Sequence, residues 1–415
     1  MRQEKEFKNP DIKELEERYG SLYKKNNDDI RSEFYRDYTR ILHSEAYRRL
    51  KHKTQVFFNA DNDHICTRIE HVSHVDSVSY SIAKGLKLDT ELTKAIAIGH
   101  DLGHAPFGHQ GETVIDDILN KYLSLEAKSV LKNEQNGKLF WHERNGLRFV
   151  DKIELLPDPK GVKRNMMLTY AVRDGIISHC GEVNQKAIKP RKEKIDLWDS
   201  FLSPGQYNPY TWEGCVVKLS DKIAYLGRDI EDAIKLGFLK AEGLDELKRI
   251  AEQFMGIETV NTTALMHTLI MDVINESTPE KGITLSQEKN ELLDTVNKFN
   301  YMYIYKNPKL DVYKQYSEMV LSKVFDFYMS MYDGAKTLLR LDNSNRDYPK
   351  LTKYFKDWLA IYSELGEKQG DSYDNYLIYG DLSNRDDYVW AIADFISGMT
   401  DSFAISLFKE LITFE

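Results

Sequence analysis

Histidine is crowded into one short part of the chain. Six of the 11 histidines lie between residues 64 and 109, and three of those six belong to the segment GHDLGHAPFGHQGE at residues 99–112. The same segment contains two acidic residues and four glycines. Imidazole nitrogens and carboxylate oxygens are ligands for divalent metal ions. A fold for this chain therefore has to bring these side chains together with donors from other segments.

Two amphipathic helices are expected around these histidines. Apolar residues recur at steps of three and four over residues 68–86, which is the periodicity of a helix with one buried face. A second helix is expected to begin at Asp89 or Thr90, because both residue types are good helix caps. Gly103 and Pro106 are expected to end this helix directly after the His-Asp pair of the crowded segment.

Most of the remaining chain also has helical periodicity, so we predict a mainly α protein with few short strands. Further helices are expected at residues 145–152, 164–179, 213–236 and 243–256. Short strands are expected at Gln55–Asn59 and Tyr301–Tyr305. Long loops are expected at residues 155–163, 186–210 and 366–387.

Composition excludes several classes of protein. Acidic residues outnumber basic ones by 66 to 57, and the resulting net charge of -9 argues against a broad nucleic-acid-binding face. The three cysteines are far apart and form no C-x-x-C motif, so neither a disulfide framework nor a thiolate zinc site is expected. No apolar signal-peptide core and no run of 18 apolar residues occurs, which predicts a soluble cytoplasmic protein that is not a membrane protein.

Four donors from three segments are candidate ligands of one metal ion. The link between the first two helices is short, so these helices are expected to run antiparallel, which brings His71 level with His100 and Asp101. Asp221 lies on a later predicted helix and can supply the fourth donor. Two imidazoles and two carboxylates form a plausible site for Mn, Mg or Fe.

Several motifs together resemble a known family. The chain is similar to the HD-domain deoxynucleoside triphosphate triphosphohydrolases, the family of deoxyguanosine triphosphate triphosphohydrolase. The similarity lies in six segments that span nearly the whole chain: RDYTRILHSEAYRRLKHKTQVF (36–57), TRIEH (67–71), HDLGHAPFGHQGE (100–112), LTYAVRDGIISHCGE (168–182), SDKIAYLGRDIEDA (220–233) and DFISGMTDSFA (394–404). The resemblance implies an HD-domain helical core with additional N- and C-terminal helices. We therefore expect an N-terminal segment at 1–66, a metal-binding core at 67–236 and a C-terminal helical region at 237–415.

The resemblance also implies roles for individual residues. It assigns the metal to the same four ligands as the spacing argument does: His71, His100, Asp101 and Asp221. It implies that the catalytic residues are His109, Glu112 and His104. It implies that the substrate is bound by Gln55, Arg68, Lys222, Tyr225 and Asp229. Residues spaced by three or four lie on one helix face. Asp221, Tyr225 and Asp229 would therefore share a face, and His109 could hydrogen-bond to Glu112 if GHQGE begins a helix.

The chain departs from the family pattern at several positions. The family commonly has Asn and Gln where this chain has Glu143 and Asn145, in the segment WHERNGLRF. His74 stands where relatives often have Glu, and we interpret it as a surface residue. His142 lies in the substituted segment and is expected to line the pocket.

The implied reaction is hydrolysis of a 2′-deoxynucleoside 5′-triphosphate, with dGTP among the candidate substrates, to deoxynucleoside and inorganic triphosphate. Two alternatives stay open: an HD-type nucleotide phosphatase or phosphodiesterase, and an oligomer that senses deoxynucleotides without turnover. The resemblance further implies a homo-oligomer, a tetramer or hexamer. The basic residues Arg48, Arg49, Lys51 and Lys53 either bind an allosteric nucleotide or form a solvated helix face.

Overall fold

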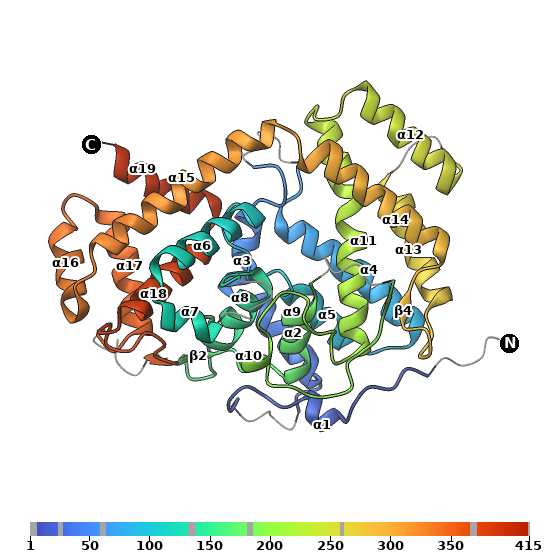
Figure 1. Ribbon diagram of the computed structural model, residues 1–415. Helices are drawn as coiled ribbons and strands as arrows, with labels where there is room; N and C mark the ends of the chain where they lie inside the picture. Colours follow the sequence, from blue (N-terminus) through green and yellow to red (C-terminus); the bar gives the residue numbers. More distant parts are fainter. Residues whose placement is uncertain are drawn as a thin grey trace.

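A computed structural model of the protein describes residues 6–23, 28–58, 64–131, 138–180, 186–257, 261–365 and 372–413. The molecule is mainly helical, which confirms the fold class predicted from the periodicity (Figure 1). Its centre consists of α4 (Arg68–Leu86), α5 (Thr90–Gly99), α9 (Tyr170–Ser178) and α11 (Trp212–Lys235). Helix α4 packs along both α5 and α11, and α5 also packs against α9 and α11. This central group carries the crowded histidines.

Local sequence determines where the first two central helices begin and end. Thr67 and Glu70 form a capping box at the start of α4, in which the Thr67 amide donates to Glu70 Oε2 at 2.8 Å. Helix α4 ends at Leu86 because Lys87 adopts a left-handed backbone conformation, with φ of 61°. Asp89 caps α5 by accepting from two backbone amides, and His100 is the residue at the C-cap of α5. The predicted bounds of α4 and the predicted start of α5 are confirmed, whereas α5 ends at Gly99, before His100 and Asp101 instead of after them.

Further helices surround the central group on its N-terminal side and in the middle of the chain. Before α4 come α1 (Ile12–Leu15), α2 (Glu33–His43), α3 (Glu45–Arg49) and the 3-10 turn η1 (Leu50–His52). Helix α2 packs along α5. Between α5 and α11 come α6 (Gly108–Tyr122), α7 (Leu125–Leu131), α8 (His142–Arg148), the π-helical turn η2 (Phe149–Ile153) and α10 (Leu197–Ser200).

The C-terminal helices lie on two opposite sides of the molecule (Figure 1). The side of α11 carries α12 (Ala241–Met255), α13 (Thr262–Glu276), α14 (Gln287–Asn300) and the π-helical turn η3 (Tyr301–Tyr305). The other side carries η4 (Gly334–Lys336), α16 (Thr337–Ser344), α17 (Pro349–Tyr362), α18 (Arg385–Ser397) and α19 (Asp401–Ile412). Helix α15 (Lys309–Ser330) runs between the two sides and packs against α6, α18 and α19.

Two small sheets join segments that are distant in the sequence. The first has the order β1–β2–β5, with β1 (Leu155–Pro157) antiparallel to β2 (Lys163–Asn165) and β2 parallel to β5 (Tyr373–Asp374). The second pairs β3 (Ala187–Ile188) with β4 (Ile283–Thr284) in antiparallel register. Strands β1, β3 and β5 fall inside predicted loops, whereas β2 overlaps the start of the helix predicted at 164–179. Each strand has only two or three residues, which is too short to give a periodic signal.

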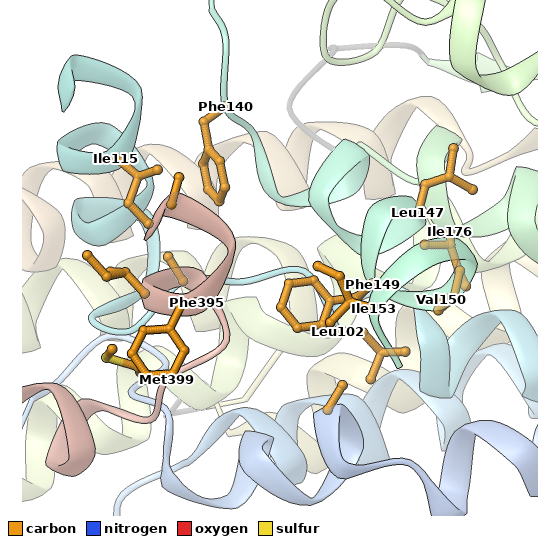
Figure 2. Packing of buried hydrophobic residues seen from close by; sticks show 14 of the residues in the cluster. Leu102, Ile115, Phe140, Leu147, Phe149, Val150, Ile153, Ile176, Phe395 and Met399 are labelled. Carbon is orange, nitrogen blue, oxygen red and sulfur yellow. The ribbon is translucent and has the colours of Figure 1, made fainter. Parts of the chain in front are cut away.

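Two clusters of buried apolar side chains hold the helices together. The larger cluster joins the N-terminal and central helices to α15, α17, α18 and α19. Figure 2 shows part of it: Phe149 and Ile153 come from η2, while Phe395 and Met399 come from α18 and the residues after it. The smaller cluster joins α4 and α11 to α12, α13 and α14. Residues from all three expected segments thus pack together, and the division at residues 66 and 236 stays a prediction.

The structure corrects three local predictions. Tyr301–Tyr305 forms a π-helical turn and not a strand, because it continues directly from α14 with its tyrosines still partly exposed. Gln55–Phe58 forms bends and a turn and not a strand, and Asn59 lies outside the described residues. The helix expected at 164–179 begins only at Tyr170, because its first residues pair in β2.

The structure also describes the state of the cysteines and the apolar character of the helices. All three cysteines, Cys66, Cys180 and Cys215, are buried and free of disulfides. No single helix in the described part of the chain is both long and apolar enough to cross a membrane. Only α18 and α19 taken together, across a bend of 118°, meet that length and composition.

A close backbone contact between Gly103 and α8 is expected to be essential for stability. A Cβ atom at Gly103 would lie 2.0 Å from the His142 carbonyl oxygen and 2.1 Å from the Gly146 nitrogen. We expect Gly103→Ala to lower the free energy of unfolding by about 3 kcal/mol, because two backbone segments must move apart. The measurement is urea unfolding. Gly237→Ala is the control, because Gly237 has open space around it and costs only about 1 kcal/mol for its left-handed backbone. Equal losses in both variants would contradict the account.

Candidate active site

One large cavity lies among α4, α11, α14 and the segment that follows α5. Its volume is about 790 Å³, which suits a ligand of nucleotide size. The lining includes every residue that the sequence analysis assigned to catalysis or to substrate, apart from Glu112: His104, His109, Gln55, Arg68, Lys222, Tyr225 and Asp229. It also includes three of the expected metal ligands: His71, Asp101 and Asp221. The structure therefore brings residues from distant segments to one place.

The four expected metal ligands meet at one buried point. His71 Nε2 lies 3.0 Å from Asp221 Oδ1, and His100 Nε2 lies 3.9 Å from the same oxygen. His100 Nε2 is also 3.6 Å from Asp101 Oδ1. Ligand atoms of His71, His100 and Asp101 all lie within 4.8 Å of one another, as do those of His100, His179 and Asp221. His71, His100, Asp101 and Asp221 are together called the metal group below, and this group could hold a divalent ion.

Two histidines of this region are held in the tautomer that metal binding requires. His100 and His179 each follow the last residue of a helix, α5 and α9. Each donates from Nδ1 to the carbonyl three residues earlier, at 2.6 Å for His100 and 2.7 Å for His179. The proton on Nδ1 leaves Nε2 with a free lone pair. His100 Nε2 is fully buried and has no hydrogen-bond partner, which is the condition of a metal ligand rather than of a structural histidine.

Asp101 connects the other expected metal ligands to Arg68 and His104. Its Oδ2 accepts from Arg68 Nη1 at 2.9 Å, and its Oδ1 lies 2.9 Å from His104 Nε2. Although burial alone would raise the pKa of Asp101, the charges of His104 and Arg68 hold it well below its usual value. Arg68 Nε and Nη2 are buried without a partner, so the guanidinium has donors available for an anion in the cavity.

A second group of side chains, called the acid–base group below, lies beside the metal group. It consists of His104, His109, Glu112 and His142, whose ligand atoms lie within 4.8 Å of one another. The rings of His104 and His142 stack with centroids 3.9 Å apart, and the ring of His109 stands edge-on to His104 at 5.1 Å. Helix α6 begins at Gly108, as expected, so His109 lies in its first turn.

The partner of Glu112 differs from the expected one. His109 Nδ1 is 3.8 Å from Glu112 Oε2, which is too long for a hydrogen bond, whereas His142 Nδ1 is 2.9 Å from the same oxygen. Helix α8 brings His142 to Glu112 across 30 residues of sequence, so a spacing argument within one helix could not reveal it. His109 stays 64 % exposed in its side chain and free to meet a ligand.

Electrostatics keeps the Glu112–His142 pair charged near neutral pH. Burial lowers the pKa of His142, but the carboxylates of Glu143 and Glu112 outweigh burial and raise it to about 9. Burial raises the pKa of Glu112, but His142 and His109 outweigh burial and lower it well below its usual value. The contribution of Glu112 to stability is complete above pH 4.5 and is lost as the pH falls further. That of His142 is complete below pH 6.5 and is lost as the pH rises through about 9.

The metal group is the better candidate for a metal ion than the acid–base group. In the acid–base group Glu112 already pairs with His142, and Lys138 Nζ approaches its other oxygen at 3.5 Å. A bound cation would be repelled by these positive charges. The metal group has a buried imidazole nitrogen without a partner and two carboxylates beside it. Its residues therefore fit a divalent ion.

Further polar residues from α11 and from the segment before α4 line the cavity. Asp229 is buried one helical turn beyond Tyr225 on α11, and its Oδ2 accepts from the Tyr305 hydroxyl at 2.5 Å. Burial raises the pKa of Asp229 to about 7. Gln55 Oε1 is buried without a partner in the described structure, and Lys222 lines the same cavity. The predicted stacking of Asp221, Tyr225 and Asp229 on α11 is consistent with these positions.

Sequence reasoning missed two residues of the site. His179 was overlooked although it follows the end of its helix as His100 follows the end of α5, and this common position is the signal that could have found it. Burial and the fields of His100 and His142 lower its pKa to about 3, so it is neutral. Tyr305 was assigned to a strand, and only the tertiary packing of η3 on α11 brings it to Asp229.

The four basic residues at the end of α3 and just after it do not form one cluster. Arg49 pairs with Glu154, and Lys53 is buried, whereas Arg48 and Lys51 are exposed. A single triphosphate site built from all four residues of one chain is therefore not supported.

Comparison with known proteins identifies the family. A family model described as HD domain matches residues 68–226, which include the metal group and the acid–base group. A deoxyguanosinetriphosphate triphosphohydrolase-like protein of Clostridium tetani (strain Massachusetts / E88) is 32 % identical over 97 % of this chain and 92 % of its own length. The chain belongs to the family of deoxyguanosinetriphosphate triphosphohydrolase-like proteins with an HD domain.

Other deoxyguanosinetriphosphate triphosphohydrolase-like proteins have similar identity. That of Caldanaerobacter subterraneus subsp. tengcongensis is 31 % identical over 92 % of this chain and 86 % of its own length. That of Desulfatibacillum aliphaticivorans is 34 % identical over 74 % of this chain and 76 % of its own length. These similarities confirm the family membership that the sequence motifs predicted. HD domains bind divalent metal ions, in agreement with the donor set of the metal group.

Removal of one ligand should abolish metal retention. We expect His71→Ala to weaken Mn²⁺ binding at least about 100-fold, because even the loss of an outer contact costs 10- to 100-fold. The measurement is metal content by mass spectrometry after dialysis. His74→Ala is the matched control, since His74 lies on the same helix but belongs to none of the candidate metal groups in the described structure. Equal retention by His71→Ala and the wild type would refute this assignment of the ligand.

Glu112 should control the protonation of His142. We expect Glu112→Gln to lower the pKa of His142 below about 9 in the metal-free protein, because the variant removes the carboxylate at 2.9 Å. The pKa is measured by NMR titration of ¹³C-labelled histidine. His267→Gln serves to identify resonances that do not belong to the site. An unchanged titration of His142 would show that the pair does not exist in solution.

Proposed function

We propose that this protein hydrolyses 2′-deoxynucleoside 5′-triphosphates to the deoxynucleoside and inorganic triphosphate. The observation that carries the proposal is the contact of the metal group with the acid–base group through Asp101, inside a cavity large enough for a nucleotide. The names of the relatives support this reaction class, and they specify deoxyguanosine triphosphate for those proteins. Among the substrates, dGTP is therefore the first to be tested.

His71, His100, Asp101 and Asp221 would hold the divalent ion, which is Mn, Mg or Fe by donor type. A divalent ion bound there supplies Lewis-acid polarisation of phosphate oxygens. His179 lies within ligand distance of Asp221 and His100 and is neutral, so it adds no charge beside these ligands.

The triphosphate would be bound by the basic side chains of the cavity. Arg68 has two donor nitrogens without partners and lies in contact with Asp101. Lys222 follows the ligand Asp221 and lines the same cavity. Charge-assisted hydrogen bonds from these two side chains would offset the negative charge that develops during phosphoryl cleavage.

The acid–base group would handle the protons. Attack of water on the α-phosphorus breaks the bond to the 5′-oxygen, which leaves with the deoxynucleoside and must gain a proton. His109 is the exposed imidazole of the group and can approach that oxygen. The attacking water releases a proton as its oxygen bonds to phosphorus, which balances the proton that His109 gives up. His142 is held protonated by Glu112 and Glu143, so it would place a positive charge beside His109. His104 bridges to Asp101 and orients the stacked rings.

The sugar would be bound at the far end of the cavity. Asp229 and Gln55 offer acceptors for the 3′-hydroxyl, and Tyr225 lies between the phosphate end and Asp229 on the same helix. Tyr305 limits the space beside Asp229 through its hydrogen bond. This enclosure is consistent with a preference for a sugar that lacks a 2′-hydroxyl. The enzyme is further expected to act as a homo-oligomer, a tetramer or hexamer, with nucleotide activation.

Turnover should depend on His109 while binding does not. We expect His109→Ala to lower kcat at least about 100-fold, because general acid–base catalysis contributes that much or more. Its affinity for a deoxynucleotide should change little, since His109 is exposed and pairs with no phosphate-binding side chain. Each of the four deoxynucleotides, alone and mixed, is incubated with Mn²⁺ or Mg²⁺, and released triphosphate is quantified. Wild-type levels of triphosphate from His109→Ala would contradict the assignment.

Product analysis separates the alternatives. Inorganic triphosphate identifies the proposed reaction, whereas single phosphate release identifies a phosphatase on the same scaffold. A wild-type protein that binds deoxynucleotides but releases neither product, alone or with mixed nucleotides, would favour the sensor.

A further inference from the structure

One motif of the chain has no role in the reaction described so far. The segment DFISGMTDSFA at residues 394–404 spans the junction between α18 and α19, and both of its acids are buried. Asp394 accepts a bidentate pair of hydrogen bonds from Arg148 at the end of α8, at 2.7 Å each. Asp401, the first residue of α19, points the other way, toward the residues that connect His104 with His109.

Asp401 binds the backbone of that connection, residues 103–108, called the catalytic loop below. Its Oδ1 accepts from the Phe107 amide at 2.8 Å. Its Oδ2 accepts from the Thr54 amide at 2.9 Å and also from the Thr54 hydroxyl. Position at the N-terminus of α19 favours the carboxylate. One buried side chain thus joins the catalytic loop to the residue next to Gln55.

Lys53 binds the same loop from the opposite end. Its side chain is buried, and Nζ donates to the His104 carbonyl and, at 3.0 Å, to the Ser397 carbonyl between the two acids. Its own carbonyl accepts from the Arg68 amide at 3.2 Å. The amine therefore ties the catalytic loop to the α18–α19 junction, and the backbone carbonyl of the same residue ties it to the first residue of α4.

The catalytic loop needs such support because its backbone is strained. Phe107 is in the left-handed region with φ of 66°, which is unfavourable for a residue with a Cβ. Gly108 follows with φ of 62°, and a Cβ there would lie 3.0 Å from Arg68 Nη2. A backbone turn of this kind persists only when surrounding contacts hold it. The Tyr313 hydroxyl contributes a further bond, to the Phe107 carbonyl, at 3.0 Å.

We propose that Lys53 and Asp401 are positioning residues that hold the catalytic loop from the α18–α19 junction. The C-terminal helices thereby complete the acid–base group, because His104 and His109 flank the held turn in sequence and their rings meet edge-on. The activity readout of this inference rests on the proposed hydrolysis, whereas its structural readout does not.

The test compares two carboxylates of the same helix. Asp401→Asn removes the charge that accepts two backbone amides at the start of α19. Glu410→Gln is the matched control, because Glu410 accepts the amides of Lys350 and Leu351 at 2.9 and 2.8 Å near the end of α19, far from the loop in sequence and contact. For each folded variant, kcat and KM are measured together with hydrogen–deuterium exchange of residues 100–110 and with Mn²⁺ content.

We expect Asp401→Asn to lower kcat about 10- to 100-fold, as for the loss of a buried charged acceptor, with KM and Mn²⁺ content nearly unchanged. Exchange of residues 100–110 should accelerate in this variant only. Glu410→Gln should keep kcat and accelerate exchange near residue 350. If Asp401→Asn does not fold, Lys53→Met is measured in the same way, because Met replaces the amine with an apolar group of similar length.

Two results would overturn the inference: unchanged kcat and loop exchange in a folded variant, or equal loss of kcat in Glu410→Gln. A wild-type protein that hydrolyses no deoxynucleotide would refute the proposed function instead. In that case the exchange data still decide whether Asp401 holds the loop.

Discussion

The convergence of two imidazoles and two carboxylates on one buried point is the constraint on which the rest of the structure depends. Removing such groups from water costs several kcal/mol per charge unless each one is paired or ligates a cation. The short link between α4 and α5 brings His71 beside His100 and Asp101, and the packing of α11 on both helices adds Asp221. The helices therefore place these groups where a bound divalent ion would compensate for their removal from water.

Asp101 connects the two halves of the site. As a member of the metal group, it lies beside His100, and the same carboxylate oxygen approaches His104. Its second oxygen accepts a hydrogen bond from Arg68. In the proposed reaction, movement of the Asp101 side chain would disturb the metal ligands, Arg68 and the acid–base group at once. This explains why the segment after α5 is built from close contacts, with Gly103 against α8 and Phe107 in a left-handed conformation. A rigid segment would hold the side chains of the acid–base group in fixed positions, because acid–base catalysis depends on short and directed contacts.

Much of the fold followed from local patterns, and the remainder depended on tertiary contacts. The bounds of α4 and α5 were predictable because periodicity and capping act within a few residues. The convergence of the four candidate ligands was predictable because these histidines and acids are concentrated in a few motifs. The Glu112–His142 pair was not, because helix α8 approaches α6 from 30 residues away. The prediction of a strand at Tyr301–Tyr305 was wrong, since alternating tyrosines suggest a strand while the preceding helix imposes a π-helical turn.

The most direct test of the central claim is anomalous diffraction from crystals of the protein soaked in Mn²⁺. The account predicts one strong peak surrounded by His71, His100, Asp101 and Asp221, at about 2.0–2.3 Å from their donor atoms. A peak between His104, His109, Glu112 and His142, or no peak near either group at saturating Mn²⁺, would contradict it.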